Sequence, residues 1–155
     1  MPSTADARRG VLDAIDRLVN AEPSADRVLA RAVELLHDRL PHFSWVGIYR
    51  VDGNELVLGP WKGPQETEHV RIPIGRGICG AAAASGVTEV VHDVAADERY
   101  LACFPSTRSE IVVPIHAGGA VVGEIDVDSD EPAAFSEEDR LFLERVARML
   151  ATRLP

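Results

Sequence analysis

The sequence predicts an α+β domain in which an antiparallel sheet carries its helices on one face. The chain has 155 residues, a length typical of one domain. Helical periodicity is confined to the two ends of the chain, apart from one short alanine-rich segment. The middle consists of short β-rich runs, and two pairs of them are joined by glycine-containing turns. Such turns connect antiparallel neighbours, so the order of elements favours this fold class.

Residues 1–41 are predicted to form two amphipathic helices. Apolar residues recur at three- and four-residue steps from Val11 to Val19, as on one face of a helix. In the second helix Ser24 is a suitable N-cap, and the helical spacing continues up to Pro41, which ends the segment.

Residues 43–128 are predicted to hold the sheet. Two β-rich runs, Ser44–Val51 and Glu55–Trp61, are joined by a tight turn at Asp52-Gly53. The segments that follow are a short strand, a short helix, another strand and a long irregular stretch, at His69–Ile74, Gly80–Ser85, Glu89–Val91 and Ala95–Pro105.

A second hairpin places its charged residues on one side. Its strands, Ile111–Ile115 and Ala120–Val127, flank Ala117-Gly118-Gly119. With a three-residue loop, Glu110 faces Asp126 and Ile115 faces Val121. One face is then apolar and carries Ile111, Val113, Ile115, Val121, Ile125 and Val127. The opposite face carries Glu110, Glu124, Asp126 and Asp128.

The chain closes with a helix predicted over residues 136–153. Ser136 is its expected N-cap, and Asp139, three residues further on, completes a capping box. Apolar residues at helical spacing follow, so this helix too has a face to bury.

Charge and composition exclude several function classes. The chain has 25 acidic and 16 basic residues, a net charge of −9, and Lys62 is its only lysine. It therefore offers no cationic surface for nucleic acid. No apolar run approaches the roughly 20 residues of a membrane span, and the first residues do not resemble a secretory signal. We expect a cytoplasmic protein with no nucleic-acid or membrane partner.

The acidic face of the second hairpin is the strongest functional signal. Carboxylates at this spacing repel one another, and burial disfavours their charged form. Either at least one carboxyl has a raised pKa, or the four acidic residues together bind a cationic ligand. The alternative is an edge strand with a solvated acidic face.

The chain has two cysteines, which are too few for a secreted disulfide scaffold and indicate either inert packing or redox chemistry. Cys79 follows a strand at the expected start of a helix, where the helix dipole and Arg76 would lower the pKa of its thiol. The surrounding GRGICG also matches the dinucleotide fingerprint, but the helix is too short and the strands are antiparallel. Alternatively, Cys79 is a small buried residue.

Cys103 lies in the irregular stretch before Glu110, where it could approach a ligand held by the carboxylates. The alternative is a hydrophobic plug that Cys103 forms with its apolar neighbours. No pair of cysteines or histidines has the spacing of a preorganised zinc site, so we predict no metal. Trp45 and Tyr49 are four residues apart on one strand and therefore share a face, as pocket wall or as core.

The motifs WVGIY, VRIPIGRGICG, LAC, SEIVVPI and GEIDVDS follow one another in this order, with Cys103 24 residues after Cys79. This combination resembles the free methionine-(R)-sulfoxide reductases, which are single-domain enzymes with the GAF fold. The resemblance runs from Phe43 to the final helix. It implies one GAF domain over residues 1–155, in which a six-stranded antiparallel sheet has helices on one face and a ligand pocket on the other.

Residue by residue, the resemblance implies that Cys103 is the nucleophile and Cys79 a resolving thiol. The other implied site residues are the pocket carboxylates and two aromatic residues beside the substrate's methyl group: Glu110, Asp126, Asp128, Trp45 and Tyr49. The three-cysteine members have a further resolving cysteine ten positions before the cysteine of GRGICG, where this chain has His69.

The implied reaction reduces free L-methionine-(R)-sulfoxide to methionine without a cofactor. Cys103 would take the oxygen as a sulfenic acid, and Cys79 would convert it to a Cys79–Cys103 disulfide that thioredoxin or a similar dithiol reduces. Two alternatives are a GAF domain that binds a small ligand without catalysis and a thiol redox sensor. The oligomeric state stays open, and a homodimer is compatible with the sequence.

Overall fold

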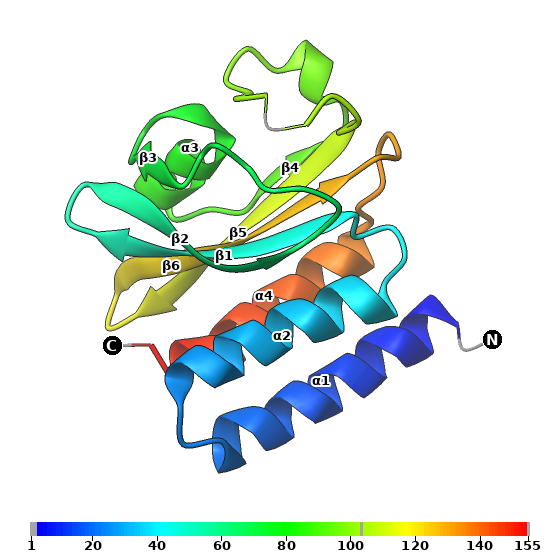
Figure 1. The fold of residues 1–155 in the computed structure, drawn as a ribbon, viewed down its shortest axis with the longest axis vertical. Helices are drawn as coiled ribbons and strands as arrows, with labels where there is room; N and C mark the ends of the chain where they lie inside the picture. The colour runs from blue at the N-terminus through cyan, green and yellow to red at the C-terminus, as the bar shows by residue number, and fades with distance from the viewer. Residues whose placement is uncertain (1–2, 103, 155) are drawn as a thin grey trace.

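Within residues 3–102 and 104–154, which the computed structural model describes, the chain forms a six-stranded antiparallel sheet (Figure 1). The strand order is β3-β2-β1-β6-β5-β4, so β1, β6 and β5 are central. The strands are β1 (Trp45–Asp52), β2 (Glu55–Lys62), β3 (Arg71–Pro73), β4 (Glu89–Val91), β5 (Ser109–Ala117) and β6 (Ala120–Ser129). The predicted fold class is confirmed.

Three long helices cover one face of the sheet: α1 (Thr4–Ala21), α2 (Ala25–Arg39) and α4 (Glu137–Ala151). Of these, α2 packs on β1 and β2, α4 packs on β5 and β6, and α1 packs against both helices from outside (Figure 1). The predicted caps are present, because the side chains of Ser24 and Ser136 accept hydrogen bonds from the backbone N–H groups of Arg27 and Asp139. No described helix combines the length and hydropathy that a bilayer crossing requires.

One helix departs from the predicted one-sided arrangement. The short α3 (Gly77–Ser85) lies on the opposite face and contacts β3, β5 and β6 (Figure 1). It begins three residues earlier than the alanine run indicates and therefore contains Cys79 in its first turn. A short 3₁₀ turn, η1 (Val94–Ala96), follows β4. Because α3 covers only part of this face, room remains beside it for a site.

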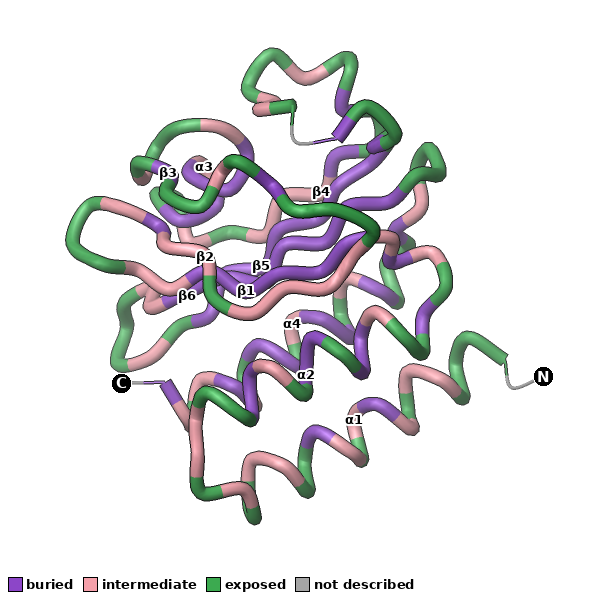
Figure 2. Tube along the Cα trace, in the orientation of Figure 1, coloured by how far each residue is buried: buried purple, intermediate pink, exposed green. Residues whose placement is uncertain are grey.

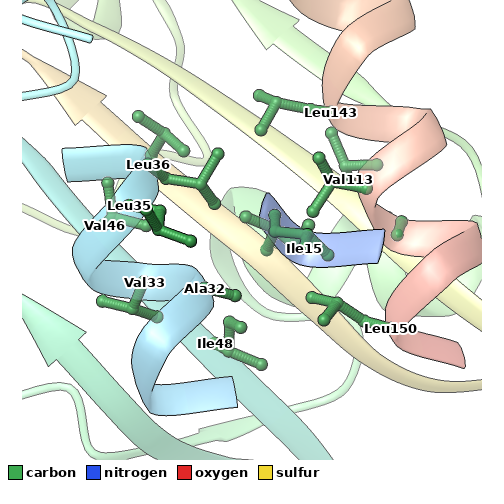
Figure 3. Packing of buried hydrophobic residues seen from close by; sticks show 14 of the residues in the cluster. Ile15, Ala32, Val33, Leu35, Leu36, Val46, Ile48, Val113, Leu143 and Leu150 are labelled. Carbon is green, nitrogen blue, oxygen red and sulfur yellow. The ribbon is translucent and has the colours of Figure 1, made fainter. Parts of the chain in front are cut away.

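The main hydrophobic core lies between the sheet and the long helices. It joins apolar side chains of every element on that side, among them Ile15, Ala32, Leu36, Val46, Ile48, Val113, Leu143 and Leu150 (Figure 3). The central strands are buried along most of their length, whereas the outer surfaces of α1 and α2 are exposed (Figure 2). We call the side of the sheet that the three long helices cover the helix face, and the side beneath α3 the pocket face.

The pairing of β5 with β6 differs from the prediction by two residues. Glu110 pairs with Asp128 rather than Asp126, and Ile115 pairs with Gly123 rather than Val121. The loop has two residues instead of three, since Gly118 and Gly119 both have positive φ angles and Ala117 pairs with Ala120. A bulge after Ile115 adds the second residue of the shift.

Because side chains alternate between the two faces of a strand, a shift of two residues leaves each side chain on its predicted face. Ile111, Ile125 and Val127 pack in the main core, and the acidic residues lie on the pocket face. Val121 is the exception: it packs against the smaller cluster beneath α3, and Val122 packs against the main core in its place. The bulge lies between Val121 and the rest of β6. The side chain of Val121 therefore points to the pocket face and not, as predicted, to the helix face.

Candidate functional site

Four carboxyl groups are buried together on the pocket face of β5 and β6. The exposed fractions are 4% for Glu110, 0% for Glu124, 3% for Asp126 and 2% for Asp128. Strand β6 lies between β1 and β5, so the acidic row is in the middle of the sheet. The alternative of a solvated edge strand is therefore wrong.

Burial raises the pKa of all four carboxyl groups, which is one of the two alternatives that the sequence left open. For Glu110 the charges of Asp126 and Asp128 raise the pKa further, to well above its ordinary value, and hydrogen bonding to both favours its protonated form. The pKa of Asp128 and that of Glu124 are also well above normal, because burial is reinforced by the charge of Asp126. Glu110 is thus the group best placed to hold a proton.

Within residues 3–102 and 104–154, these carboxyl groups form no ion pair. Both carboxyl oxygens of Glu124 and one each of Asp126 and Asp128 also have no hydrogen-bond partner among the described residues. Buried polar groups are nearly always satisfied, so a cluster like this one is suited to a ligand that brings positive charge or hydrogen-bond donors.

Cys79 faces this cluster from α3 and is 6% exposed. The pKa of its thiol is raised well above the usual value, first by burial and then by the charges of Asp126, Glu124 and the other two carboxylates. The expected lowering of this pKa by the helix start is therefore wrong. A nearby helix end contributes less than burial beside four carboxyl groups, and Arg76 is exposed.

A small cavity lies beside Cys79 and two of the acidic residues. It is lined by Tyr49, His69, Ile72, Ile78, Cys79, Leu101, Glu110 and Asp126 and offers about 20 Å³, enough for one water molecule. One potential ligand atom from each of Cys79, Glu110 and Asp126 lies within 4.8 Å of the other two. These distances would also suit a divalent cation, provided that the thiol ionised.

The two predicted aromatic residues lie on the same face of β1, and both are buried. Tyr49 lines the cavity and donates a hydrogen bond from its hydroxyl to the carbonyl of His69, at 2.8 Å. Trp45 pairs with Asp128 in the sheet and packs against Trp61 and Phe104. Its ring lies over Gly47, where a Cβ atom would come within 2.4 Å of the indole. The glycine in WVGIY therefore makes room for the tryptophan.

Cys103 lies outside the described residues. Two nearby residues in the sequence are described: Leu101 lines the cavity, and Phe104 is buried, with its ring centroid 5.8 Å from that of Trp45. These apolar contacts agree with the hydrophobic-plug interpretation for Leu101 and Phe104. The role of Cys103 stays a prediction.

Sequence reasoning gave His69 no role of its own. The structure places it at the cavity, with its ring Nε2 3.3 Å from the carbonyl oxygen of Ala102 and its side chain 23% exposed. Its backbone N–H donates to the Thr67 hydroxyl at 3.1 Å. No local pattern in the sequence indicates this contact, because Ala102 is 33 residues away.

Comparison with known proteins assigns the family. The GAF domain profile matches residues 24–154. The chain belongs to the GAF domain family. It is 35% identical over 139 residues to the free methionine-R-sulfoxide reductase of Escherichia coli K12, an alignment that covers 87% of this chain and 83% of that protein. Within the GAF family the chain groups with the free methionine-R-sulfoxide reductases, as its motifs indicated.

Two solved structures extend this likeness to three dimensions. The free methionine-R-sulfoxide reductase of Neisseria meningitidis, solved in complex with its substrate, has a TM-score of 0.91 and 41% identity, covering 99% of this chain and 91% of that one. The type II free methionine-R-sulfoxide reductase of Thermoplasma acidophilum has a TM-score of 0.81 and 40% identity, covering 83% and 91%. Both likenesses span most of this chain.

Proposed function

We propose that this GAF domain reduces free methionine-(R)-sulfoxide to methionine. The observation that carries the proposal is the buried acidic cluster, which has no cationic partner among the described residues and faces a thiol across a small cavity. The named relatives support the same substrate. An amino acid is much larger than one water molecule, so its binding requires the surrounding side chains to move apart.

The free amino group explains why the cluster is acidic. The ammonium of the substrate would pair with Asp126 and Asp128, and this pairing lowers the free energy of the ionised carboxylates. A methionine sulfoxide within a peptide has an amide at that position and carries no such charge. It would leave the two buried carboxylates unpaired, which is a strong basis for discrimination.

Glu110 is suited to act as the general acid. Its raised pKa favours the protonated form, which can donate a proton to the sulfoxide oxygen. The Cys103 thiolate would attack the substrate sulfur. The oxygen and the donated proton then pass to Cys103 as a sulfenic acid, methionine leaves reduced by two electrons, and the thiolate is oxidised by two electrons.

The second half of the cycle would use Cys79. Its thiol attacks the Cys103 sulfenic acid, a disulfide forms, and the hydroxyl leaves as water with the thiol proton. Thioredoxin or another dithiol then reduces the disulfide by exchange. Because the pKa of Cys79 is raised, few of its thiols are ionised at neutral pH, and we expect this step to be slow. A cytoplasmic location, where such dithiols occur, stays a prediction.

Methionine release measures the proposed activity directly. The purified protein is mixed with free methionine-(R)-sulfoxide and dithiothreitol, and methionine is quantified. We expect steady turnover of the free amino acid and none of the same residue within a peptide. Cys103→Ser should lose turnover. Cys79→Ser should stop after about one equivalent when only a protein dithiol is supplied. Full activity in Cys103→Ser would refute the mechanism.

A further inference from the structure

His69 makes contacts that tie two separate segments of the chain together at the cavity. Its backbone is held by Thr67 and by the Tyr49 hydroxyl, at 3.1 and 2.8 Å. Its ring reaches the carbonyl of Ala102, at 3.3 Å. The residue therefore connects the wall of the pocket, through Tyr49, with the segment that immediately precedes Cys103.

The contact with a carbonyl oxygen determines which nitrogen of the His69 ring carries a hydrogen. A carbonyl oxygen only accepts hydrogen bonds, so Nε2 must be the donor and must carry a hydrogen. The same atom lies 4.0 Å from the carboxylate of Glu68, which also favours a donor at this position. Among the eight described residues that line the cavity, His69 is the one whose side chain can be cationic.

We propose that His69 is a positioning residue, which holds Ala102, the residue before Cys103, at the pocket by donating a hydrogen bond from Nε2 to the Ala102 carbonyl. This inference rests on the proposed reductase function. It assigns His69 an effect on the chemical step and no part in holding the substrate, since the binding charges belong to the acidic cluster.

Two substitutions separate the hydrogen bond from the rest of the imidazole. His69→Ala removes the donor, whereas His69→Gln keeps an N–H donor at a similar distance from the backbone without a titratable ring. The matched control is His116→Ala. The Nε2 of His116 also lies 3.0 Å from a backbone carbonyl, that of Gly86, but His116 does not line the cavity.

The readout is the rate constant for release of the first equivalent of methionine at saturating sulfoxide. For His69→Ala we expect a drop of about 10-fold, the effect of one hydrogen bond, with the apparent Kd changed by less than about 3-fold. His69→Gln should recover most of the rate, and His116→Ala should match the wild type. Melting temperatures within about 2 °C of one another would separate positioning from loss of fold.

Three results would overturn the proposal: a wild-type rate in His69→Ala, a defect in His69→Gln as large as that in His69→Ala, or an equal loss in His116→Ala. Hydrogen exchange provides a readout that does not depend on catalysis. The amides around Ala102 should exchange faster in His69→Ala than in the wild type or His69→Gln. If the wild type releases no methionine, the proposed function fails, and the exchange result alone then decides the role of His69.

Discussion

The two faces of the sheet differ in composition although the same strands build both. On β6, Ile125 and Val127 enter the main core, while Asp126 and Asp128 lie between and beside them on the other side. Burial on the helix face removes apolar surface from water and stabilises the fold. Burial on the pocket face removes carboxyl groups from water and raises their pKa values, which destabilises it. One strand thus has a face whose burial stabilises the fold and a face whose burial destabilises it.

The largest expected effect is on the helix face. Ile125→Ala removes a fully buried side chain from the main core and should lower the free energy of unfolding by about 2–5 kcal/mol. Chemical denaturation would measure the loss. Turnover per folded molecule should stay near the wild-type value. A loss below about 1 kcal/mol would show that this face does not carry the stability assigned to it.

The neighbouring residue tests the other face. Asp126→Asn should lower kcat/KM for free methionine sulfoxide by about 100-fold, because an amide cannot pair with the ammonium. The free energy of unfolding at pH 8 should rise, since a buried group that resists ionisation is replaced by a neutral one of equal size. Opposite signs for Ile125→Ala and Asp126→Asn would establish the contrast. A destabilised Asp126→Asn would contradict it.

The pH dependence of stability should reflect the pocket face. A carboxyl with a raised pKa keeps its proton in the folded state, while the unfolded chain releases it above about pH 4.5. The folded protein then binds more protons than the unfolded chain, so stability should fall as pH rises from about 5 towards the raised pKa values. Denaturation at several pH values would measure the slope, and Glu124→Gln should flatten it.

The ionisation of Asp139 changes stability in the opposite direction and at lower pH. Burial alone would raise the pKa of Asp139, but hydrogen bonding to His42 and the charges of His42 and Arg8 leave it below normal. Its contribution is present above its ordinary pKa and is lost only below about pH 4. Asp139 therefore adds nothing to the slope of stability between pH 5 and 8.

The smallest expected effect is at the helix cap. Ser136→Ala removes the hydrogen bond that the Asp139 N–H donates to the serine hydroxyl at 3.1 Å, and should lower the free energy of unfolding by about 1 kcal/mol. Methionine release should be unchanged. The same change at Ser3, which caps the outer helix α1, provides a control for a cap at a more exposed position, and we expect a smaller loss there.

Periodicity in the sequence was sufficient to predict the elements and the acidic face, because the side-chain period of 2 in a strand is preserved by the even register shift. It could not predict the bulge after Ile115, so the orientation of Val121 was wrong. The pKa of Cys79 was also predicted in the wrong direction. That value depends on carboxyl groups that are distant along the chain, and the local motif carries no information about them.

The family resemblance gave more specific predictions of the site residues than the residue pattern did. The pattern alone left Trp45 and Tyr49 as wall or core, and the structure places Tyr49 at the cavity and Trp45 beside Phe104. The residue pattern also could not predict the contact between His69 and Ala102, because no periodic spacing relates residues in two separate loops. Contacts between irregular segments depend on the packing of the whole domain.

The raised pKa values of the acidic cluster should couple the proposed binding of an ammonium group to the release of protons. If the substrate's ammonium pairs with Asp126 and Asp128 as proposed, it should release protons that burial retains on these two carboxyl groups, while Glu110 keeps its proton. Affinity should therefore increase with pH over the range in which the cluster is protonated. Calorimetry in buffers of different ionisation enthalpy would count the protons released for each molecule bound.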